Sequence, residues 1–78
     1  MPIINDFYSF LQYHLLEIGC YLKTVTKYNE DSWIVIIFMS GKWNQYKIRK
    51  KLADLEFYPV NFVHNHHMSE LHITIEKI

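Results

Sequence analysis

Residues 33–39, Trp-Ile-Val-Ile-Ile-Phe-Met, form a run of seven apolar residues in a chain of 78. A strand of a small open sheet normally alternates apolar and polar residues, because one of its faces meets water. A run without a polar position predicts a central strand with apolar side chains on both faces. The apolar character of the residues on its outer face then needs a separate explanation.

The composition predicts a single domain over residues 1–78. Half of the residues are hydrophobic, 21% are charged and the formal net charge is zero, which argues against a disordered tail or a general polyanion binder. The longest apolar run is far below the roughly 20 residues of a membrane-spanning helix, so no membrane contact is expected. A lone cysteine, Cys20, favours a reducing cytoplasm.

Residue usage also carries a hint of origin. Ile, Lys, Asn, Tyr and Phe are abundant, whereas Ala and Arg occur once each. These abundant residues have A+T-rich codons, which favours a low-GC bacterium, a phage or a large DNA virus as the source. A β-rich fold is the structural alternative, because strands also favour Ile, Tyr and Phe.

Hydrophobic spacing predicts the order of elements. Residues 5–18 and 44–56 show helical periodicity, and Gly19 is placed to end the first helix. Residues 21–40 are typical of one hairpin, and residues 58–65 with 70–77 of a second. The expected fold is α+β with the order αββαββ, a two-layer sandwich in which two helices cover one face of a four-stranded antiparallel sheet. A helix bundle and a three-stranded variant are the alternatives.

The same order arises when the first strand of a ferredoxin-like βαββαβ unit is moved to the C-terminus. This is a relation of topology and not a resemblance of sequence. It gives the expected sheet a permuted ferredoxin-like topology, with the strand at 33–39 between the first and fourth strands.

The expected hairpin registers decide which side chains face away from the helices. Pairing Tyr28 with Trp33 puts the lysines of the first strand on one face, and edge lysines normally point to water. This register sends Thr24 and Thr26 to the helix side. The residues expected to bind a partner on the open face are Lys23, Val25, Ile34, Ile36, Phe38 and His72. Those expected beneath the helices are Trp33, Val35, Ile37 and Met39.

The second hairpin is expected to pair Asn65 with Glu70, which places Val60 opposite Ile75. Its outer face then carries His72 beside the apolar residues of the central strand. An apolar patch with a polar rim indicates a protein-interaction surface, for a homodimer or for a different partner. Shading by long neighbouring side chains is the alternative reading.

A basic segment lies between Lys42 and Lys51, where five of the eight positive charges are concentrated. The expected contacts to phosphates or to an acidic partner are Tyr46, Lys47, Arg49, Lys50 and Lys51. Cations beside an aromatic ring are a pattern that binds nucleic acid. A solvated helix surface is the structural alternative.

Residues 64–72 contain four histidines, but the expected register points His64 and His72 to opposite faces. Neither a C-x-x-C pair nor an H-E-x-x-H helix completes a zinc motif, so no metal and no cofactor are expected. A Cys20–His nucleophilic pair lacks any accompanying oxyanion-hole or glycine-rich element, so no enzyme activity is expected.

The sequence therefore predicts a small non-catalytic protein-binding module that acts by occupying a partner surface. Size and codon usage favour an inhibitor of a host enzyme or defence complex, encoded by a phage or mobile element. A nucleic-acid-binding module that uses the basic helix at 44–56 is the alternative.

Overall fold

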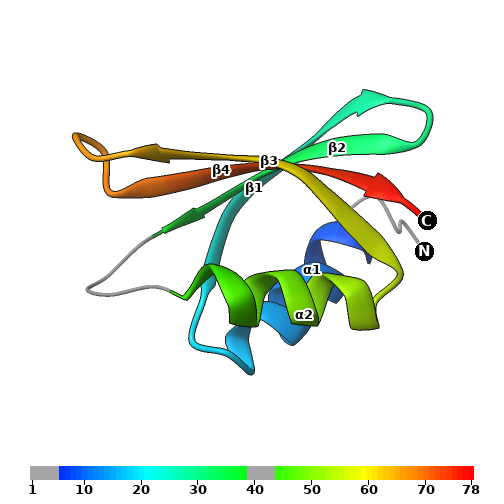
Figure 1. Ribbon diagram of the computed structural model, residues 1–78, viewed down its shortest axis with the longest axis horizontal. Helices are drawn as coiled ribbons and strands as arrows, with labels where there is room; N and C mark the ends of the chain where they lie inside the picture. The colour runs from blue at the N-terminus through cyan, green and yellow to red at the C-terminus, as the bar shows by residue number, and fades with distance from the viewer. Residues whose placement is uncertain (1–5, 39–43) are drawn as a thin grey trace.

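The computed structural model describes residues 6–38 and 44–78. Its elements, in chain order, are α1 (Asp6–Leu16), β1 (Tyr21–Asn29), β2 (Ser32–Phe38), α2 (Gln45–Asp54), β3 (Phe57–Asn65) and β4 (Glu70–Lys77). The strands form one antiparallel sheet in the order β1-β2-β4-β3. Both helices lie on the same side of this sheet (Figure 1). The predicted α+β fold is confirmed, as is the central position of the apolar strand.

The first helix ends where the sequence predicts. The N–H of Cys20 donates to the carbonyl of Leu15 at 2.9 Å, and the N–H of Gly19 donates to the carbonyl of Leu16 at 3.0 Å. These two bonds form a Schellman motif, in which the residue after the cap adopts a left-handed conformation. Gly19 has φ +77°, which glycine adopts without a Cβ penalty. The chain can therefore turn directly into β1.

The hydrophobic core lies between the helices and the sheet. Its buried residues are Leu11, Leu15, Cys20, Leu22, Val35, Ile37, Ile48, Leu52, Phe57, Leu71, Ile73 and Ile75. The rings of Phe7, Trp33 and Phe57 meet at one end, with centroids 4.8–5.6 Å apart. The predicted inward direction of Trp33, Val35 and Ile37 is confirmed, whereas Met39 falls outside the described residues.

Edge strand β1 contains a β-bulge that brings two apolar residues to the same face. Leu22 and Val25 are three positions apart, so a regular strand would point them to opposite faces. A register shift between Leu22 and Thr24 removes this conflict: Leu22 opposes Ile37, and Val25 opposes Val35. Both residues then contact the core.

A second register shift, between Lys27 and Asn29, overturns the predicted pairing of Tyr28 with Trp33, because a shift of one residue inverts the faces. Val25 was expected on the open face and instead packs against the core. Lys27 opposes Trp33, with its Nζ 5.4 Å from the centre of the indole ring. Thr24 and Thr26 take the open-face positions.

Edge strand β3 is bulged in the same way. Pro59 opposes Ile75 and Asn61 opposes Thr74, so Val60 is the extra residue and its predicted pairing with Ile75 is wrong. The remaining pairs from Asn61 to Asn65 follow the predicted register. The bulge lets Pro59 and Phe62, again three positions apart, both oppose core residues of β4.

Candidate interaction surface

The open face of the sheet is the face that the helices leave uncovered. The apolar strip of β2, defined as Ile34, Ile36 and Phe38, lies on this face and alternates with the buried Val35 and Ile37. Ile34 and Ile36 are partly buried, and Phe38 remains 47% exposed. The uninterrupted apolar run therefore serves two surfaces, of which only one is covered by the chain itself.

Neighbouring strands continue this face on both sides. On β1 the residues that oppose the apolar strip are Thr26, Thr24 and Tyr21, and on β4 they are Thr74, His72 and Glu70. Tyr21 is 56% exposed, and Val63, which opposes His72 from β3, is 52% exposed. Tyr21 therefore extends the apolar strip onto β1, whereas His72 separates the strip from Val63.

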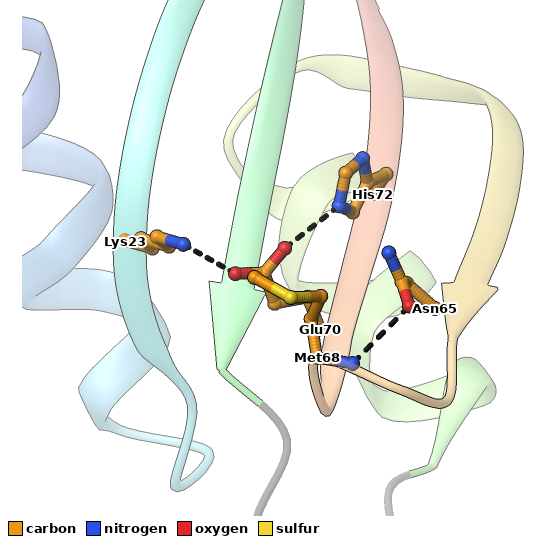
Figure 2. A network of polar contacts seen from close by, with 5 residues as sticks. All are labelled: Lys23, Asn65, Met68, Glu70 and His72. Atoms are coloured by element: carbon orange, nitrogen blue, oxygen red, sulfur yellow. Dashed lines mark hydrogen bonds and ion pairs between the residues drawn. The ribbon is translucent and has the colours of Figure 1, made fainter.

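A polar network crosses the open face at one end of the strip. The Lys23 Nζ of β1 donates to Glu70 Oε2 of β4, and the other carboxylate oxygen, Oε1, lies 3.0 Å from His72 Nε2 (Figure 2). The Glu70 side chain is only 5% exposed. This nearly buried carboxylate has a partner on each oxygen, which is the condition for burying a charge.

The hydrogen bond from Lys23, followed by that from His72, holds the pKa of the Glu70 carboxyl below its ordinary value. A carboxylate only accepts hydrogen bonds, so the Nε2–H group of His72 is the donor. Lys23 and Glu70 neutralise each other, and the network adds no unpaired negative charge to the open face. A partner could cover this end of the face without burying an uncompensated carboxylate.

Lys23 also contacts the apolar strip. Its Nζ lies 5.6 Å from the centre of the Phe38 ring, on the way to Glu70. The long side chain therefore covers part of Phe38, which is the shading by a neighbouring side chain that the sequence offers as an alternative to an interaction surface. The covering is incomplete, because almost half of Phe38 still faces solvent.

Sequence reasoning missed Glu70 as part of this site, although it placed Lys23 and His72 there. The expected register of the second hairpin already put Glu70 on the same face as His72. The missing step was the register between β4 and β2, in which Phe38 opposes Glu70. A lysine of β1 and a glutamate of β4 on either side of Phe38, at the same end of the open face, are the signal that would have found the network.

The basic helix forms a second surface, on the opposite layer. Lys47, Lys50 and Lys51 of α2 line a groove of about 490 Å³ together with Glu17, Ile18 and Asp54. Lys51 Nζ lies 2.8 Å from Glu17 Oε1. The hydrogen bonds from Lys51 and then from His14 lower the pKa of the Glu17 carboxyl, so this carboxylate stays charged in the groove.

The structure divides the predicted cationic set. Arg49 does not line the groove but stacks on Phe62 of β3, with its guanidinium carbon 4.7 Å from the ring centre. Tyr46 is exposed and is also absent from the groove lining. Of the predicted set, only the three lysines therefore line the groove.

The histidine-rich hairpin places the His64 and His66 rings against each other, with centroids 4.1 Å apart. Among residues 6–38 and 44–78, no group of three His, Cys, Asp or Glu side chains is arranged to hold a metal ion. Cys20 is buried, and burial raises the pKa of its thiol. A raised pKa disfavours the thiolate that nucleophilic chemistry needs.

Comparisons with known proteins give no match, whether with family models, curated proteins or solved structures. Within the described ranges, neither helix has the length and apolarity needed to cross a bilayer.

Proposed function

We propose that this chain is a small non-catalytic protein-binding module whose open sheet face covers an apolar surface of a protein partner. The observation that carries the proposal is the apolar strip, in which Phe38, at the end of β2, is 47% exposed on a sheet face that no helix covers. The exposed Tyr21, which opposes Phe38, widens the patch. Contiguous apolar surface with a polar border is the usual mark of a protein contact.

The charge of the open face favours a protein over a nucleic acid. Its lysine, Lys23, is already paired with Glu70, whereas phosphate binding depends on cations that are free to replace counterions. Three of the flanking positions, Thr24 and Thr26 on β1 and Thr74 on β4, are hydroxyl-bearing threonines. Such a face is complementary to an uncharged, apolar surface.

The size of the face predicts a reversible contact. Four strands about 4.8 Å apart, each of about eight residues with a rise of about 3.3 Å, span about 19 by 26 Å, or about 500 Å². Stable interfaces bury about 800 Å² on each partner. The open face alone therefore suits a module that binds and releases.

A photo-crosslinking phenylalanine at position 38 tests this proposal in extracts of the source organism. We expect crosslinks to a discrete protein, which are lost when Ile36→Asp is added. The matched control carries the same crosslinker at Tyr13, an exposed aromatic residue of α1. Crosslinks that survive Ile36→Asp, or that form equally from position 13, would contradict the proposal. A product of twice the chain mass would identify a second copy as the partner.

We propose that the fold is the permuted ferredoxin-like arrangement, supported by the sheet order β1-β2-β4-β3, in which β4 takes the place of the first strand. We also propose an inhibitor of a host enzyme or defence complex, encoded by a phage or mobile element. The inhibitor proposal is supported by chain length and A+T-rich residue usage.

A further inference from the structure

The groove is lined by residues of α2 and of the turn that follows α1. Both helices lie on one side of the sheet, opposite its open face (Figure 1). The groove volume of about 490 Å³ falls within the range of about 300–1,000 Å³ typical of ligand clefts. Partly buried Ile18 supplies an apolar wall, and lysines come from one side only, α2. The groove can therefore hold an apolar side chain beside charged groups.

The three lysines of the groove are not equivalent. Lys51 is held by Glu17, whereas Lys47 and Lys50 are exposed, and neither makes an ion pair with another described residue. They are three positions apart on α2, so their side chains leave the helix about 5–6 Å from each other. Two free ammonium groups at this spacing match two carboxylates that alternate along an extended peptide, about 6.6 Å apart.

The carboxylates of the groove select against a uniform polyanion. Glu17 stays ionised because of its bond to Lys51, and Asp54 lies on the same lining. A phosphate backbone would bring its charges close to both, and like charges repel. A short peptide can instead place carboxylates at the lysines and an apolar or neutral side chain elsewhere.

We propose that this groove binds a short acidic peptide segment of a protein partner, with Lys47 and Lys50 pairing two of its carboxylates and Ile18 contacting an apolar side chain between them. This contact is independent of the open sheet face. A module with both surfaces can engage two segments, one on each of its layers.

Fluorescence anisotropy with labelled peptides tests the proposal directly. The probe is a twelve-residue peptide that repeats Glu-Leu-Glu-Ser, and its matched controls replace every Glu by Gln or every Leu by Ser. We expect the acidic peptide to bind more tightly than either control, and to lose affinity as salt is raised. The Lys47→Gln/Lys50→Gln double variant should weaken binding about five- to tenfold, the size expected for two exposed ion pairs.

Lys27→Gln is the matched variant for charge loss, because Lys27 lies on β1 away from the groove. It should leave the affinity unchanged. Equal binding of the Gln peptide, or an equal effect of Lys27→Gln, would overturn the proposal. Tighter binding of a twelve-nucleotide oligothymidylate than of the acidic peptide would also overturn it, in favour of a nucleic-acid ligand. None of these results depends on the open face.

Discussion

Two adjacent isoleucines of β2 provide a matched test of the two faces of the sheet. Ile36 lies in the apolar strip and opposes Thr24 and His72, whereas Ile37 is 0% exposed and opposes Leu22 and Leu71. The substitutions Ile36→Thr and Ile37→Thr make the same chemical change in the same strand. Because Thr is also β-branched, the strand preference is nearly unchanged and the environment dominates the result.

The expected losses follow from what each hydroxyl meets. At position 37 the change removes about one buried methylene with its cavity cost, about 0.5–1.5 kcal/mol, and leaves a hydroxyl without a partner, about 1–3 kcal/mol. The sum of the two losses is about 1.5–4.5 kcal/mol. At position 36 the hydroxyl reaches water, and the loss should stay below about 1 kcal/mol. A domain of 78 residues has about 4–12 kcal/mol of unfolding free energy, so the larger loss is a substantial part of it.

Urea unfolding followed by tryptophan fluorescence and circular dichroism measures both losses. With a slope of about 1 kcal/mol per molar urea, the midpoint of Ile37→Thr should fall at least about 0.5 M below that of Ile36→Thr. Equal shifts would refute the reasoning, because they would mean that the open face is as buried as the core. A slope that differs between the variants would show instead that the unfolding transition itself had changed.

Other predictions concern the helix ends and the pH dependence of stability. Glu56 has φ +68°, a conformation that costs a residue with a Cβ about 1 kcal/mol, so Glu56→Gly should raise the free energy of unfolding by about 0.5–1 kcal/mol. The reciprocal change, Gly19→Ala, should lower it by about 1 kcal/mol through backbone strain alone, because the added Cβ meets no atom within 4 Å; urea midpoints that move the other way would contradict both. The contacts with Lys23 and His72 lower the pKa of Glu70 below 4.5, so their stabilisation is complete above that value and is lost as pH falls through the lower folded-state pKa. Urea midpoints between about pH 7 and pH 3 should therefore fall more steeply for the wild type than for Glu70→Gln, and parallel curves would rule out this contribution.

Much of the fold could be predicted because the central elements have regular periods. Alternation in β4, helical spacing in both helices and Gly19 as a helix stop each favour one structure without help from the rest of the chain. The register of β1 could not be settled in this way. A regular strand cannot point both Leu22 and Val25 to the core. The expectation that the lysines point to water then selected the wrong register. The chain resolves the conflict with a bulge, whose energy depends on packing that a single strand does not contain.

The site was predictable only in part for a related reason. Ile34, Ile36 and Phe38 follow from the period of β2, which is local. The contact of Lys23 with Glu70 joins residues 47 positions apart and passes across β2, so it requires both hairpins to be in place. The position of Arg49 could not be predicted for the same reason, because Arg49 stacks on Phe62 of β3, a residue outside the basic helix.

The bulges of the two edge strands also affect how this sheet can bind a partner. A flat edge strand recruits another strand through its unpaired backbone groups, and proteins prevent this with bulges, lysines and proline. Edge strand β1 has two register irregularities and carries Lys23 and Lys27, while β3 has a bulge beside Pro59. Both edges are therefore poor templates for strand addition. The open face between them has no such protection, and its apolar strip is the part of the sheet that a partner can cover without disturbing the ladder.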